Sequence, residues 1–311
     1  MENKNSSVAK ESEHKDQYTA GFLKNGIIRG ITYQLKVLTW VTWKMLSKKD
    51  ASKWWLGTEV VDARGFHDLV LKYVNNAVDE DGKTSDKRYM YRFVQIKHMT
   101  RLTGGLKISI PQLLSVEKEY CQYSLIYLFK SYMHIINKFE KIMPDQIVDM
   151  TVFTNRDINT SLEFLVPVNR DEIFGFEEKG KRYRFDLDAL RKAPNLIIER
   201  LRMIPPRDET HVWNFLGKLV FAVGQPSEPE LEELIVKDMG KVFNMPQIFY
   251  NDLFKNITDW FLILEKDSAP YLTEEYIKKH LKKMEDMLLA QKKSNTFFID
   301  DSLSFSKLSL T

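Results

Sequence analysis

Three polar residues stand inside apolar, strand-like stretches of the sequence: Asp68, Gln95 and Lys97. Residues i and i+2 of a strand point to the same face, so Gln95 and Lys97 should share one side of the third predicted strand. We expect Asp68, on the neighbouring strand of a hairpin, to lie beside them. Polar groups in such strands cost on the order of 1–3 kcal/mol each when they are left unpaired, so their presence needs a reason.

A divalent cation is one such reason. A carboxylate, an amide oxygen and a backbone carbonyl are ligands for a hard cation such as Mg²⁺, with Mn²⁺ as a substitute. We therefore predict that Asp68, Gln95 and the carbonyl of Ile96 bind the metal, with Glu59 of the preceding strand as a further carboxylate. Lys97 would orient or deprotonate the attacking water, whose pKa the metal lowers.

A structural interpretation of the same residues stays open. The spacing Gln-x-Lys occurs often by chance, and a lysine near a strand end commonly extends its ammonium into water. An aspartate at position 68 could simply cap a turn. His98 could contact a phosphate, although a single histidine beside a strand end is more often structural.

Basic residues flank the predicted site and could contact a phosphate backbone. They are Arg88, Arg92, Arg101 and Lys107. A charged run at the edge of a sheet is nevertheless usually a solvated face, so these residues alone do not identify a nucleic-acid surface.

The elements that must hold these residues alternate between helix and strand. Apolar residues recur at helical spacing over 26–46 and again over 121–139. Strands are predicted over residues 52–61, 65–74, 88–99 and 146–155. The pair Asp81-Gly82 indicates a hairpin turn before the third strand, and the second helix allows the fourth strand to lie parallel to the third. The predicted fold class is α/β, with the element order α-β-β-β-α-β.

The rest of the chain is predicted to be mostly helical from 166 to 291, between two tails. Helices are expected around 213–222, from Ser227, around 250–264 and over 273–291, and a strand entering a helix over 181–193. Ser227 and Glu230 have the spacing of a capping box. This helical region is a candidate for binding a protein partner. Residues 1–20 and the Ser-rich residues 292–311 are expected to be tails without a fold of their own.

Composition excludes several classes of protein. The chain has 311 residues, a hydrophobic fraction of 43% and a net charge of +3, which indicates a globular protein without identifying a nucleic-acid binder. Its single cysteine, Cys121, excludes an intrachain disulfide and a cysteine-based zinc site. No apolar window is long enough to span a bilayer and the N-terminus lacks a signal-peptide core. We therefore expect an intracellular protein of the cytoplasm or nucleus that does not contact membranes.

About half of the chain resembles a divergent family of PD-(D/E)xK nucleases that carries a Gln-x-Lys variant of the motif. The family's helix has a Tyr-Gln pair, matched by Tyr33-Gln34, and its hairpin has a Glu followed by Phe-Asp-Asp, matched by Glu59 and Phe66-His67-Asp68. Its third strand has Gln-x-Lys-His, matched by residues 95–98, and its fourth has Thr-Asn, matched by Thr154-Asn155. Similar domains occur in bacterial anti-phage endonucleases, in arthropod proteins joined to ankyrin repeats and in bacterial cytoplasmic-incompatibility factors.

The resemblance implies a restriction-endonuclease-like domain over 21–165 that cleaves DNA with Mg²⁺, RNA being the alternative substrate. It also implies that Gln34 supports the site. One position departs from the family: His67 stands where the first acid of the Asp-Asp pair would be. In a regular strand His67 would point away from Asp68, so Asp68 is the expected ligand. The alternative function is a catalytically degenerate nuclease-like module that binds nucleic acid or protein.

Overall fold

A computed structural model describes residues 23–48, 53–75, 88–99, 107–116, 123–159, 164–192, 195–263 and 270–293. Several predictions lie outside these residues: the tail over 1–20, the turn at Asp81-Gly82, the residues Arg101 and Cys121, and the tail from 294 onward.

The described strands form one mixed sheet of eight strands, in the order β5-β6-β7-β4-β3-β2-β1-β8. Their bounds are β1 Trp54–Gly57, β2 Leu69–Asn75, β3 Arg88–Lys97, β4 Ile147–Thr154, β5 Leu165–Pro167, β6 Lys181–Phe185, β7 Leu219–Val223 and β8 Leu272–Thr273. The pairs β3–β4 and β4–β7 are parallel, and the other pairs are antiparallel. The predicted α/β class is therefore confirmed.

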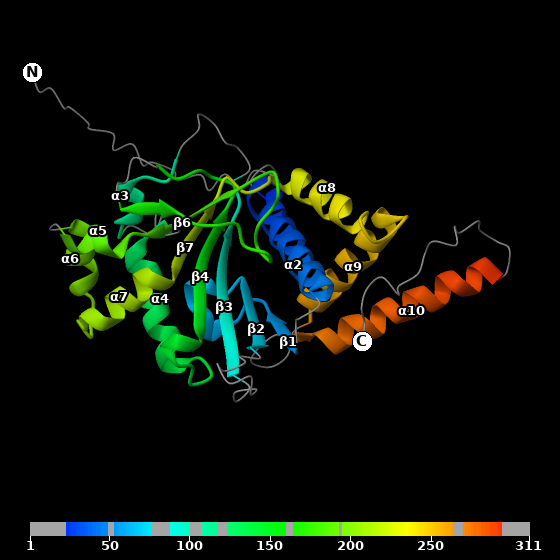
Figure 1. Ribbon diagram of the computed structural model, residues 1–311, viewed down its shortest axis with the longest axis horizontal. Coiled ribbons are helices and arrows are strands. Elements are labelled where there is room, and N and C mark those ends of the chain that lie inside the picture. Colours follow the sequence, from blue (N-terminus) through cyan, green and yellow to red (C-terminus); the bar gives the residue numbers. More distant parts are fainter. Residues whose placement is uncertain are drawn as a thin grey trace, which may run out of the picture.

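Helices cover both faces of the sheet, with α4 and α7 on one side and α2, α8 and α9 on the other (Figure 1). The first layer contains α3 Ile110–Leu113, α4 Leu125–Lys138, α5 Leu187–Lys192, α6 Leu196–Arg202 and α7 Glu209–Lys218. The second contains α2 Arg29–Ser47, α8 Glu228–Met239, α9 Pro246–Phe261 and the start of α10 Glu274–Lys293. In the described parts of the chain no helix is long and apolar enough to cross a bilayer.

Apart from short helical turns, the elements from Arg29 to Thr154 follow the order α2, β1, β2, β3, α4, β4. Helix α4 returns the chain across the sheet, so that β4 runs parallel to β3 and pairs Gln95 with Val152. Two strands are shorter than predicted, because β1 ends at Gly57 and β2 begins only at Leu69. A 3-10 helix, η2 Val61–Phe66, replaces the end of the first predicted strand and the start of the second, and includes the residues between them.

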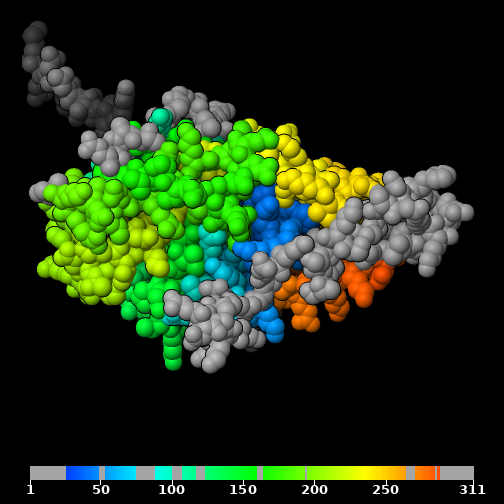
Figure 2. Space-filling model, viewed as in Figure 1, coloured from blue at the N-terminus to red at the C-terminus, as the bar shows by residue number. Residues whose placement is uncertain are grey.

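Helix α2 is buried on nearly all sides rather than along one stripe. Every residue from Tyr33 to Trp43 is buried, because α8 and α9 pack against the side that faces away from the sheet. The buried Lys36 forms ion pairs with Glu228 and Glu232 of α8. In Figure 2 the blue atoms of α2 are visible as a patch between the green and yellow parts of the chain.

The second half of the chain contributes strands as well as helices. The helix predicted over 213–222 ends at Lys218, and the segment Leu219–Val223 is instead strand β7 beside β4. All five residues of β7 are buried, and a short apolar run that is buried on both faces suits an inner strand better than a helix. The predicted strand and helix over 181–193 are confirmed as β6 and α5, and the capping box of Ser227 and Glu230 starts α8.

Candidate metal centre

Glu59, His67 and Asp68 come together between the end of β1 and the start of β2. The Nδ1 atom of His67 lies 3.0 Å from Glu59 Oε2 and 3.3 Å from Asp68 Oδ1. One ligand atom from each residue can be chosen so that all three lie within 4.8 Å of one another. Two carboxylates and one imidazole at this separation could share a single divalent cation.

The backbone between the strands is bent sharply to bring these side chains together. Glu59 has φ 51° and Arg64 has φ 45°, which places two non-glycine residues in the left-handed region. Such residues cost on the order of 1–3 kcal/mol each and persist where the surrounding structure holds them. Here the N–H of Val60 donates to the carbonyl of His67 across the loop at 3.2 Å. This bond closes the turn and holds Glu59 near His67 and Asp68.

Gly65 allows this turn to rest directly on α4. Its N–H donates to Ser131 Oγ at 3.1 Å, and a Cβ placed on it would lie 2.6 Å from Cε1 of Tyr127. A methyl group there would require the side chains of Tyr127 and Ser131 to move. The close contact therefore fixes where η2 ends and how Phe66, His67 and Asp68 leave it.

Asp68 contacts β3 as the sequence predicts. The side-chain amide of Gln95 donates to Asp68 Oδ2, and the backbone N–H of Ile96 donates to the same oxygen at 2.6 Å. The carboxylate is buried, with 5% of the residue exposed. Ile96 therefore contacts Asp68 through its N–H, whereas the sequence predicts its carbonyl as a metal ligand. With Oδ2 held by two donors, Oδ1 is the oxygen that faces His67.

Gln34 supports both carboxylates from α2. Its amide donates to Glu59 Oε1 at 2.8 Å, and to Thr58 Oγ1 and the Asp68 carbonyl at 3.2 Å each. The hydroxyl of Thr58 in turn donates to the Asp68 carbonyl at 2.9 Å. These bonds set the spacing between the end of β1 and the start of β2, on which the separation of the two acids depends.

The charges of the site are coupled. The hydrogen bond with Glu59 raises the pKa of His67, and the same bond is the main reason that the pKa of Glu59 is lowered. Burial raises the pKa of Asp68, although the positive charges of Lys97 and His67 act in the opposite direction. The charge of Lys97 also acts on Glu59 and His67, in each case toward a lower pKa, although the pKa of His67 is raised overall.

Three predicted residues lie elsewhere. The ring of His98 packs on Tyr33 of α2, with 4.5 Å between ring centroids, and no contact with the ligand group is found among its described interactions. Arg92 does not reach solvent, because its guanidinium is buried in ion pairs with Asp149 and Asp171. Arg88 pairs with Asp145 at the start of β3, the end of the strand remote from Lys97. These residues are therefore not part of the ligand group.

The structure adds two residues that the sequence interpretation missed. His67 was expected to point away from Asp68, but it adopts α-helical angles at the end of η2 and so lies on the same side. Thr58 was not considered, although it is buried and bonded to both Gln34 and Asp68. The signal for the first was Gly65, which as a turn former can delay the start of a strand.

The ligand set suits a borderline transition metal better than a purely hard cation. Carboxylates favour Mg²⁺ and Mn²⁺, and an imidazole shifts the preference away from Mg²⁺ toward Mn²⁺ and later metals. The three side chains fit such an ion by type and spacing. No protein-family model matches the chain, and no curated protein matches it either. The assignment of this site therefore rests on the distances and contacts described above.

Proposed function

We propose that the chain is a metal-dependent nuclease that hydrolyses DNA phosphodiester bonds on a restriction-endonuclease-like core. The observation that carries the proposal is the convergence of Glu59, His67 and Asp68 beside Lys97. The element order from α2 to β4 and the parallel pairing of β3 with β4 support the same fold. A metal between the end of β1 and the start of β2, with a lysine of β3 nearby, is an arrangement that suits phosphodiester hydrolysis.

Each residue has a distinct role in this proposal. Glu59, His67 and Asp68 hold the cation, which would lower the pKa of a bound water and offset charge on the phosphate oxygens. Gln95 orients Asp68 through its amide, and Gln34 holds Glu59. Lys97 orients the attacking water and stabilises the negative charge that develops on the phosphate.

A catalytically degenerate module that binds nucleic acid or protein is the second candidate. One observation favours it: both carboxylates already have a partner in His67, and Asp68 also accepts bonds from Gln95 and Ile96. A protonated His67 can neutralise Glu59 without any metal. The fold would then be kept for binding alone.

Cleavage of supercoiled plasmid separates the two candidates. Purified protein is incubated with plasmid in Mn²⁺, in Mg²⁺ and in EDTA, and a parallel reaction contains single-stranded RNA. The nuclease proposal expects nicked or linear DNA with either metal, faster with Mn²⁺, and none with EDTA. The variant Asp68→Asn should be inactive, while Asp259→Asn, an exposed acid on α9, should cleave like wild type. If the wild-type protein binds the plasmid but does not cleave it, the result would instead support the binding module.

A further inference from the structure

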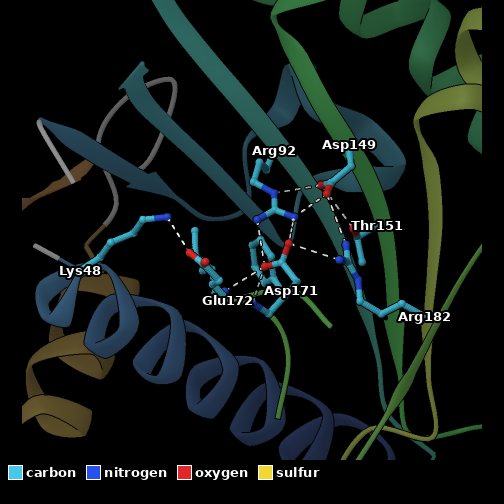
Figure 3. Close-up of polar contacts among 9 residues, drawn as sticks. Lys48, Arg92, Asp149, Thr151, Asp171, Glu172 and Arg182 are labelled. Carbon is cyan, nitrogen blue, oxygen red and sulfur yellow. Dashed lines mark hydrogen bonds and ion pairs between the residues drawn. The ribbon is translucent and has the colours of Figure 1, made fainter. Parts of the chain in front are cut away.

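A buried group of charges lies on the α2 side of the sheet, away from the metal centre. Figure 3 shows Arg92 of β3, Asp149 of β4, Arg182 of β6 and Asp171 between β5 and β6 joined by hydrogen bonds. The guanidinium of Arg92 lies 2.5 Å from both Asp149 Oδ2 and Asp171 Oδ2. The terminal nitrogens of Arg182 lie 3.2 Å from Asp171 Oδ2 and 3.4 Å from Asp149 Oδ2. Four charges therefore balance each other in one network.

Arg184 adds a further positive charge to this network. Strand β6 alternates, so Tyr183 and Phe185 enter the core beside α4, while Arg182 and Arg184 share the opposite face. Burial is the main cause that lowers the pKa of Arg182, and the charges of Arg92 and Arg184 add to it. With Arg184 included, three guanidinium groups face two carboxylates.

Two N–H donors of these arginines lack a hydrogen-bond partner within the described residues. The Nε atoms of Arg182 and Arg184 are both buried, and within the described residues neither has a hydrogen-bond partner. The side chain of Arg182 is only 9% exposed, and Arg184 is half-buried. A buried donor without a partner is costly, and arginine donors remain paired in most structures. Two adjacent unpaired N–H groups with a net positive charge thus indicate that an anion belongs at this position.

We propose that Arg182 and Arg184 form a binding site for a phosphate group, separate from the candidate metal centre. A guanidinium offers donors in a planar fork that matches two oxygens of a phosphate, and two guanidiniums can share one such anion. The half-buried Arg184 gives the anion access from solvent, and Arg182 sits deeper with its terminal nitrogens already engaged. The site does not depend on nuclease activity, because it uses none of the residues of the metal centre.

Thermal unfolding with inorganic phosphate tests this site directly. The protein is melted in EDTA, so that the metal centre plays no part, with phosphate or with sodium chloride at equal ionic strength. Millimolar phosphate should raise the Tm of wild type by about 2–4 °C over chloride if the phosphate concentration is about tenfold above the Kd. Arg184→Gln should abolish the rise. Lys181→Ala removes an exposed cation from the other face of β6 and should leave the rise unchanged.

Two further measurements guard against a trivial result. Without phosphate, Arg184→Gln should melt at or above the wild-type Tm, because the change removes an uncompensated charge. Arg184→Lys should keep part of the phosphate response, since the charge remains. Three results would each overturn the proposal. Phosphate could raise the Tm of wild type and of Arg184→Gln equally, Lys181→Ala could lose the rise as fully as Arg184→Gln, or phosphate could raise the Tm of wild type no more than chloride does.

The source of the phosphate is distinguished by fluorescence anisotropy. A labelled single-stranded oligonucleotide with a 5′-phosphate is compared with the same strand without it, and inorganic phosphate and a mononucleotide serve as competitors. Binding that depends on Arg184 and is displaced only by excess strand indicates a nucleic-acid backbone. Displacement of the strand by millimolar mononucleotide or phosphate indicates a site for free phosphate compounds. Oligonucleotide binding that is unaffected by Arg184→Gln contradicts a nucleic-acid source.

Discussion

The Nδ1 atom of His67 lies 3.3 Å from Oδ1 of Asp68, although consecutive residues in a strand would point to opposite faces. The two side chains meet because His67 ends the 3-10 helix η2 and has α-helical angles, φ −81° and ψ −16°. The residue that stands where the resembled nuclease pattern has its first acid therefore lies beside the second, within reach of any cation that Asp68 would hold. This changes what mutation of His67 should do.

Mn²⁺ should raise the Tm of the wild-type protein, and His67→Ala should remove much of the rise. A ligand that binds only the folded state adds about 2.7 kcal/mol of stability when its concentration is about a hundred times the Kd. Loss of one of three protein ligands should weaken binding by at least about tenfold. Thermal unfolding at several Mn²⁺ concentrations measures the apparent Kd of each variant. His134→Ala, on the nearby α4, is the matched control. If His67→Ala responds to Mn²⁺ like wild type, His67 is not a ligand.

Lys97→Ala should slow plasmid cleavage by about 10²-fold or more while the Mn²⁺-induced rise in Tm remains. Proton transfer and charge stabilisation by a positioned side chain typically contribute about 10²–10⁴-fold to a rate. Lys97 is at the end of β3 and partly exposed, so its removal should cost the fold little. Lys130→Ala removes an exposed lysine of α4 and should cleave at the wild-type rate. Cleavage by Lys97→Ala at that same rate would remove Lys97 from the mechanism.

Two glycine-to-alanine changes should have opposite effects. Gly65→Ala forces a Cβ to within 2.6 Å of Tyr127 and 2.7 Å of Ser131 Oγ, so we expect a loss of about 1–3 kcal/mol and a weaker response to Mn²⁺. Gly30→Ala lies near the start of α2 with nothing within 4 Å of the new methyl group, so it should gain up to about 1 kcal/mol. Urea unfolding measures both. Equal stability of the two variants would show that the contact between η2 and α4 is not tight.

Acid should destabilise the protein partly through Asp171. Burial by itself would raise the pKa of this carboxyl, but hydrogen bonds and charge from Arg92 and Arg182 outweigh it and hold the pKa below its ordinary value. A carboxyl with a depressed pKa stabilises the folded state above its unfolded pKa of about 4, and that contribution is lost as the pH falls below this value. Asp171→Asn should therefore cost about 3–5 kcal/mol at pH 7, and it should reduce the dependence of the unfolding free energy on pH below about 4.

Asp188→Asn provides the comparison for that experiment. Asp188 has 81% of its side chain exposed, and its only described salt bridge is a surface pair with Arg191. We expect a change within about 0.5 kcal/mol at pH 7, because exposed pairs contribute little. Urea unfolding of wild type and both variants at pH 7, 5, 4 and 3 provides the four-point comparison. Similar pH profiles for wild type and Asp171→Asn would contradict the role assigned to Asp171.

The sequence predicts the contact of Asp68 with β3 because it depends only on alternation along strands. Gln95 and Ile96 continue the regular pairing of β3. Once β2 pairs with β3, the carboxylate of Asp68 therefore lies beside these two residues. The position of His67 could not be predicted in this way. It depends on the positive φ of Arg64 and on the contact of Gly65 with α4. Both come from tertiary packing, which leaves no periodic pattern in the sequence.

The same difference explains the second half of the chain. The capping box at Ser227 is local, and the structure contains it as predicted. Strand β7 was assigned to a helix because a five-residue apolar run has no periodicity that separates a buried strand from the end of a buried helix. The segment is a strand because it pairs with β4, which lies about seventy residues earlier in the chain and is not visible to a local pattern.

The pairing of β7 with β4 means that the chain cannot be shortened at the boundary suggested by the family resemblance. A fragment of residues 21–165 would leave the backbone of Met150, Thr151, Val152 and Phe153 without its neighbour. It would also leave α2 without the helices that cover it. An apolar strand with a free edge recruits strands from other molecules, so such a fragment should aggregate whether or not the residues of the candidate metal centre are intact. Activity assays on this protein therefore require residues from both halves.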